Sequence, residues 1–96
     1  MAIIDIAVRE KMTLKVSSLS EPHKVATSII KNMQEGKIVE TISIGAGAIN
    51  QSMKAIIIAR GIMAQQGTDL TIRPGFQDVS ISSETKTAIK MLVIRS

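Results

Sequence analysis

Residues 38–67 read IVETISIGAGAINQSMKAIIIARGIMAQQG and predict a strand, a tight turn and a long helix in succession. The first part, 38–44, is rich in β-branched residues, which favour strands. The turn is Gly45-Ala46-Gly47-Ala48, and we expect the helix over roughly 48–66, where Gly67 ends it. Strand and helix therefore follow each other with almost no connecting loop.

The preceding segment predicts the same two elements. Residues 12–17 alternate apolar and polar side chains, which is typical of a half-buried strand. Ser20 is a good helix N-cap, and Glu21 and Pro22 suit the first turn. Apolar residues then recur at helical spacing until Gly36, which supplies a left-handed stop.

The C-terminal part predicts strands without a helix. A third strand over 69–73 either ends at Pro74-Gly75 or continues over 76–81. Ser82-Ser83-Glu84 forms a turn, and a fourth strand covers 86–95.

The order is therefore β-α-β-α-β-β. Right-handed crossovers place both helices on one face of a four-stranded mixed sheet, which gives an α/β two-layer sandwich. We expect Phe76 in the core. The opposite sheet face is predicted to carry polar side chains, namely Thr13, Lys15, Thr41, Ser43, Thr71, Arg73 and Lys90.

The second helix has more apolar residues than one face needs. A stripe of Ile49, Ser52, Ile56, Ala59 and Met63 can face the sheet. Two further isoleucines, Ile58 and Ile62, fall outside this stripe. They need to be covered by the neighbouring helix or by another subunit. We therefore expect a homodimer or higher oligomer.

Length and composition exclude several classes of protein. The chain has 96 residues, so we expect one domain over 12–96 and an N-terminal arm over 1–11. No cysteine and a single histidine exclude a disulfide framework, a thiolate metal site and a multi-histidine site. We expect no metal, no cofactor, no membrane contact and a cytoplasmic location. No nucleophile–histidine–acid set is evident, so an enzyme is not expected.

The glycine turn leaves two alternatives open. Unsatisfied amides at a helix N-terminus bind phosphate, and Gly45 and Gly47 would let an anion approach the backbone closely. However, position 50 is Asn rather than the third glycine of a dinucleotide fingerprint, and no Gly-Lys-Ser/Thr follows. The same glycines also suit an ordinary tight turn.

The net charge of +4 permits a polyanionic partner, but no segment forms a basic tail. Arg73, Lys86 and Arg95 are expected at strand ends near the final hairpin. Contacts with phosphate are predicted for cationic, amide and glycine residues that folding would bring together, which are Lys24, Gly45, Gly47, Asn50, Gln51, Lys54, Arg73 and Lys86.

Several motifs together resemble the stage V sporulation protein S family. They are Leu14-Lys15-Val16-Ser17, Ser20-Glu21-Pro22 with Val25-Ala26, Ile44 to Gln51, Lys54-Ala55, Ile58-Ala59-Arg60-Gly61, Pro74 with Phe76, and Thr87-Ala88-Ile89-Lys90. This resemblance implies an Alba-like domain in a small dimeric bacterial protein of spore development. It also implies nucleic-acid contacts by the loop after the first strand, the start of the second helix and the final hairpin, which here are Ser17–Lys24, Ala46–Lys54 and Ser80–Lys86.

Three functional hypotheses follow. The first is a non-enzymatic, dimeric regulator that binds DNA or RNA through phosphate contacts with weak sequence selectivity. The second is a protein–protein interaction module in sporulation or cell division that binds no nucleic acid. The third is a small-anion sensor at the glycine turn.

Overall fold

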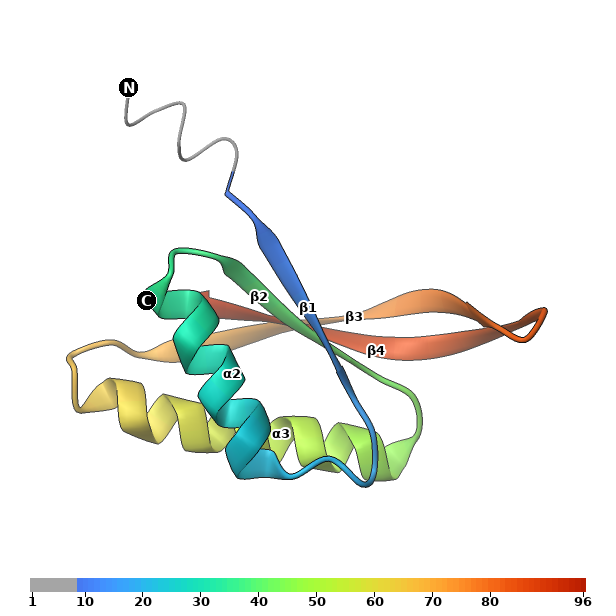
Figure 1. Ribbon diagram of the computed structural model, residues 1–96, viewed down its shortest axis with the longest axis horizontal. Helices are drawn as coiled ribbons and strands as arrows, with labels where there is room; N and C mark the ends of the chain where they lie inside the picture. The colour runs from blue at the N-terminus through green and yellow to red at the C-terminus, as the bar shows by residue number, and fades with distance from the viewer. Residues whose placement is uncertain (1–8) are drawn as a thin grey trace.

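The computed structural model describes residues 9–96 and contains four strands and two helices (Figure 1). Their bounds are β1 Lys11–Val16, α2 Pro22–Gln34, β2 Ile38–Ser43, α3 Ala46–Ala64, β3 Leu70–Ile81 and β4 Glu84–Arg95. The predicted element order is confirmed. Of the predicted arm, residues 1–8 lie outside the described residues, and Lys11 already belongs to β1.

The sheet is mixed, as predicted, with the strand order β1-β2-β4-β3. The strands β1 and β2 are parallel, while β4 runs antiparallel to both of its neighbours. Both helices lie on one face of the sheet (Figure 1). The buried cluster between the layers includes Ile29 of α2, Val39 of β2 and Met63 of α3. The predicted two-layer α/β sandwich is therefore confirmed.

The side chains of β2 face the opposite way to the one expected. Register places Glu40 and Ile42 beside Thr13 and Lys15 of β1, on the sheet face away from the helices. Hence Thr41 and Ser43 face the helices and are buried, so their predicted exposure was wrong. Apolar residues occur on both faces of β2, with Val39 toward the helices and Ile38 and Ile42 away from them, so its alternation does not specify which set of side chains faces the helices.

Small side chains on β2 let α3 pack closely. The hydroxyls of Ser43 and Ser52 hydrogen-bond to each other in the buried layer. The buried stripe of α3 also consists largely of small residues, which include Ala48, Ala55 and Ala59. Large residues at these positions would push the helix away from the sheet.

Thr41 suggests a substitution that should raise stability. Its side chain is fully buried, and its Oγ1 has no hydrogen-bond partner within residues 9–96. Thr41→Val keeps the branched shape and removes the unpaired hydroxyl, so we expect about 1 kcal/mol more stability. Urea unfolding followed by circular dichroism measures this.

A matched control is Thr13→Val, because Thr13 is exposed and its hydroxyl donates to Glu40 Oε2 at 2.9 Å. This variant is expected to gain nothing. A loss of stability in Thr41→Val would contradict the prediction.

The strand β3 is continuous through Pro74, which settles the alternative that the sequence left open. Proline is tolerated there because β3 is an edge strand. The turn to β4 has two residues, Ser82 and Ser83, whose φ angles are 51° and 69°. Positive φ at both positions is typical of the tight turn that matches strand twist.

Phe76 does not enter the core, and the prediction that it does was wrong. Its side chain is 80% exposed. It lies in the half of β3 nearer the turn, opposite Ile89 of β4. The described chain leaves most of its ring uncovered.

Candidate nucleic-acid interface

Two predicted contact segments meet at one end of the sandwich. The parallel strands β1 and β2 end side by side, with Val16 opposite Ser43. The loop after β1 leads into α2, and Gly45 leads into α3, so both helices start at this end (Figure 1). We call residues 17–24 and 45–54 the rim.

The hairpin extends from the same end of the sheet. Ile89 of β4 pairs with Ser43, and the hairpin continues from there to its turn at Ser82. Val79, Ser80 and Ile81 line a hollow together with residues of the loop after β1. The three segments named by the resemblance therefore lie at one end of the molecule.

The loop after β1 is held against α3 by two of the predicted contact residues. A Cβ on Gly47 would lie 3.0 Å from the Cβ of Ser18, so only glycine fits without a shift. The amide of Gln51 donates through Nε2 to the carbonyl oxygen of Ser20 at 2.9 Å. Gly47 and Gln51 thus serve to position the loop.

The start of each helix differs in detail from the sequence prediction. Ser20 does not cap α2, because its Oγ instead accepts a bond from the Ser17 amide at 2.9 Å, and Glu21 occupies the N-cap position. Gly45 is the N-cap of α3 with φ 91°, a region that favours glycine. Helix α3 therefore begins at Ala46, earlier than expected.

The cations of the rim are exposed on the helix side. Lys24 has an 83% exposed side chain and pairs with Glu21 at 3.3 Å. Lys54 is exposed and has no ion pair within residues 9–96, and Asn50 is exposed one turn before it. Lys24, Asn50 and Lys54 are therefore the accessible polar groups of the rim among those predicted.

Arg73 and Lys86 belong to another surface. Register and alternation place both on the sheet face away from the helices, which we call the open face. The open face carries five cations and two acids, which are Lys11, Lys15, Arg73, Lys86 and Lys90, and Glu40 and Glu84. The structure thus divides the predicted contact residues between the rim and the open face.

Glu40 is the buried acid of the open face. Its side chain is 7% exposed, and its carboxylate lies 3.5 Å from Lys11 Nζ. It also accepts the hydrogen bond from Thr13 described above. The remaining open-face cations have no ion pair with a carboxylate of the described chain.

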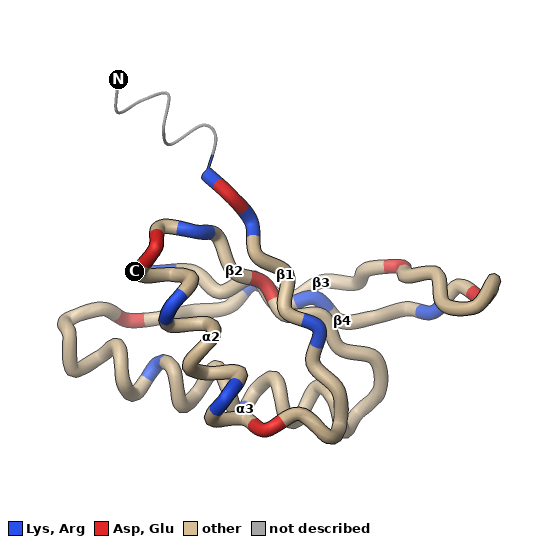
Figure 2. The backbone as a smooth tube through the Cα atoms, viewed as in Figure 1, with Lys and Arg blue, Asp and Glu red and all other residues tan. Residues whose placement is uncertain are grey.

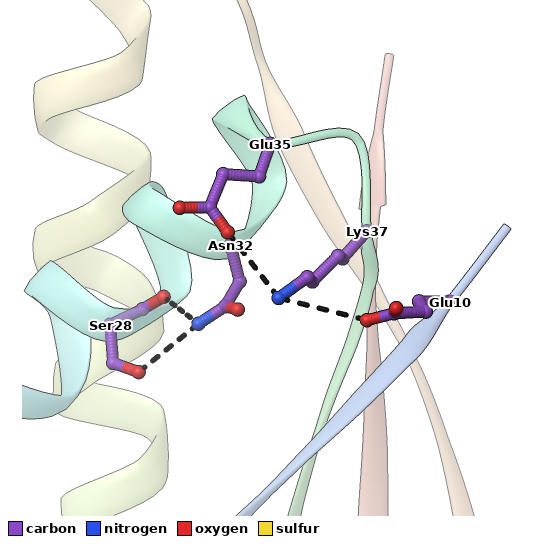
Figure 3. A network of polar contacts seen from close by, with 5 residues as sticks. All are labelled: Glu10, Ser28, Asn32, Glu35 and Lys37. Carbon is purple, nitrogen blue, oxygen red and sulfur yellow. Dashed lines mark hydrogen bonds and ion pairs between the residues drawn. The ribbon is translucent and has the colours of Figure 1, made fainter.

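Two cations at the opposite end, Lys37 and Arg60, are paired with the protein's own acids. Lys37 lies between Glu10 and Glu35, at 3.7 Å and 3.3 Å from their carboxylates (Figure 3). Beside it, the Asn32 amide donates to the carbonyl oxygen of Ser28 at 2.8 Å. The ion pairs of Lys37 link the end of α2 to Glu10, just before β1, at the end of the sheet away from the rim.

Two arginines at this end also donate hydrogen bonds within the chain. Arg60 Nε donates to Asp69 Oδ1 at 2.8 Å. That bond, together with one from the Leu70 amide, holds the pKa of Asp69 below its ordinary value. Arg95 was expected near the hairpin, but it lies at the other end of β4 and donates to the Met33 carbonyl oxygen at 3.1 Å. Figure 2 shows how cations and acids alternate at this end.

The open face also has an apolar part that the sequence pattern did not predict. It includes Ile38, Ile42, Ile44, Val79 and Ile81, which line hollows of this surface. Ile38, Ile42 and Ile44 do lie on one side of the alternation along 38–44. The prediction that Thr41 and Ser43 lie on the open face implied that these isoleucines face the helices.

The described part of the chain contains no cluster of three or more His, Asp or Glu side chains that could hold a metal ion. Within residues 9–96, neither helix is both long and apolar enough to cross a membrane.

A family model described as Stage V sporulation protein S (SpoVS) matches residues 12–96. The chain therefore belongs to this family, as its motifs indicated, and its role is related to sporulation. The strand and helix order and the mixed four-stranded sheet are those of an Alba-like sandwich.

Proposed function

We propose that this member of the stage V sporulation protein S family acts in sporulation as a homo-oligomeric, non-enzymatic protein that binds nucleic acid. The observation that carries the proposal is the distribution of charge. Four lysines of the rim and the open face have no ion pair within the described chain, which are Lys15, Lys54, Lys86 and Lys90. At the other end, Lys37 and Arg60 are paired with acids.

Phosphate contacts are the kind of binding that this surface supports. Lysines satisfy phosphates without reading bases, so binding is expected to be weakly selective. The chain has one aromatic residue and therefore few platforms for stacked bases. A duplex or a structured RNA fits these properties better than an unpaired strand.

The test is a salt series with a labelled DNA duplex and a labelled RNA hairpin, followed by fluorescence anisotropy. If about four lysines each neutralise one phosphate, log K should fall with log salt at a slope of about −3 to −4. Absence of titratable binding at low salt for both probes would refute the proposal.

Self-association is proposed from α3. Ile57 is 63% exposed and Ile62 is 42% exposed, and Met53 lies one turn before Ile57. Ile58, which the sequence placed outside the sheet-facing stripe, is half-buried and packs against the chain's own core. The neighbouring elements thus cover Ile58. Ile62 lies about 140° around the helix from Ile57, so the proposed interface is centred on Met53 and Ile57, which share one exposed face.

Met53→Glu together with Ile57→Glu is expected to change the protein from dimer to monomer, because charges would have to be buried in the interface. Light scattering coupled to size exclusion gives the mass. Gln65→Glu, which adds a charge just after the same helix, is the control and should leave the mass unchanged. A wild-type mass of one chain would contradict the proposed dimer.

A further inference from the structure

An apolar hollow lies on the open face between β2 and the hairpin. Its apolar side walls are Ile42 and Ile44 on one side and Val79 and Ile81 on the other, and its volume is about 380 Å³. Ile44 and Ile81 are 38% and 46% exposed, respectively. The strand β4 runs between these walls. Between Lys86 and Lys90 it places only the small side chain of Ala88 on the open face.

One lysine lines this hollow, and two others are cross-strand neighbours of its apolar walls. Lys15 of β1 and Lys90 of β4 are the two cross-strand neighbours of Ile42. Lys86 is the cross-strand neighbour of Val79. Adjacent strands are about 5 Å apart, so each lysine stands directly beside an apolar wall. Glu84, opposite Ile81 at the tip, is the nearest acid by register.

Within the described chain, no other element packs over the apolar walls and no acid pairs with the three lysines. None of the three lysines has an ion pair within residues 9–96. The helices lie on the other face of the sheet and leave the isoleucines uncovered (Figure 1). An occupant must therefore supply apolar side chains for the hollow and negative charge around them.

We propose that the hollow binds an acidic, amphipathic segment of a partner protein. A leucine or isoleucine of the segment would enter between Ile42 and Val79, and neighbouring carboxylates would pair with Lys15, Lys86 and Lys90. Burial of the apolar group provides most of the affinity, and the lysines select for acidic sequences.

Nucleic acid suits this hollow less well than it suits the rim. No aromatic ring lines the hollow on which a base could stack. The polar side chains at its margin, apart from Lys15, are the serines Ser17, Ser18 and Ser80. A base placed against four aliphatic walls would leave its hydrogen-bonding groups unpaired, which is unfavourable. This inference does not depend on the proposed nucleic-acid function.

The experiment selects peptides from a phage-displayed random library on the immobilised full chain. We expect the selected peptides to combine two or more Asp or Glu residues with Leu or Ile. Their affinity is then measured by fluorescence anisotropy with the wild type, Val79→Ser, Lys86→Glu and Lys54→Glu. The last variant makes the same charge change on the helix side, away from the hollow.

Val79→Ser and Lys86→Glu should each weaken peptide binding about tenfold, which corresponds to about 1.4 kcal/mol, while Lys54→Glu should leave it unchanged. Far-ultraviolet circular dichroism confirms that the variants fold. Selection of no peptide, selection of peptides without acidic residues, or equal loss in Lys54→Glu without loss in Val79→Ser would overturn the proposal. The last outcome would mean that any polyanion binds the cationic end by charge alone.

Discussion

Lys54→Glu and Lys86→Glu are each expected to weaken nucleic-acid binding on the order of tenfold, and the double variant about a hundredfold. Both lysines are exposed and have no ion pair within residues 9–96, so neither is neutralised by the described chain. Each reversal removes a phosphate contact and adds a repulsive charge. The slope of log K against log salt should also become shallower by about one for each lysine.

Lys31→Glu is the matched control for this pair. Lys31 is exposed on α2 in its last turn, away from the rim, and the substitution changes the net charge equally. Anisotropy titrations at several salt concentrations compare the three single variants. If Lys31→Glu weakens binding as much as the other two, net charge alone governs binding and the rim has no special role.

Gly47→Val is expected to destabilise the protein by about 2–4 kcal/mol. A Cβ at this position would already lie 3.0 Å from the Ser18 Cβ, and valine adds two methyl groups beyond it. The loop after β1 would have to leave α3, and the hydrogen bond from Gln51 to the Ser20 carbonyl oxygen would be lost. Urea unfolding followed at 222 nm measures the change.

Gly61 provides the control on the same helix. A Cβ there meets nothing within 4 Å, so the contact argument does not apply. Gly61→Val should change stability by no more than about 0.5 kcal/mol, because glycine and valine both have modest helix propensity. Equal losses in the two variants would show that backbone propensity, and not the Ser18 contact, explains Gly47.

The order of elements could be predicted because residues with special backbone chemistry mark the boundaries. Gly36, Gly45 and Gly67 all have positive φ, and each stands at the end or the start of a helix. Pro22 stands in the first turn of α2, as its fixed φ favours. These local signals do not depend on how the layers later pack.

Which face of β2 turns toward the helices could not be predicted, because its isoleucines lie on the side away from them. Ile38, Ile42 and Ile44 alternate as core residues do, while the side that contacts α3 carries Thr41 and Ser43. The helix approaches closely at small residues, and this depends on the alanines of a separate element. An apolar pattern within one strand contains no information about that partner.

The candidate site was predicted in part for a similar reason. Lys24 was selected from its place near the start of a helix and Lys54 because it lies one turn after Asn50, which are local properties. Gly47 and Gln51 were assigned to an anion, whereas they contact the loop that ends near Ser20. Contacts between segments far apart in the sequence decide this, so the hollow beside Val79 could not be identified either.

The two-residue turn at Ser82 and Ser83 also has a kinetic consequence. It brings β3 and β4 together with the shortest loop between any paired strands of the sheet, so their closure costs the least chain entropy. The pairing of β1 with β2 requires a crossover through the loop after β1 and through α2. We therefore expect folding to start most readily at the hairpin and to reach β1 last, and β1 to be the first strand to exchange its amide protons with solvent.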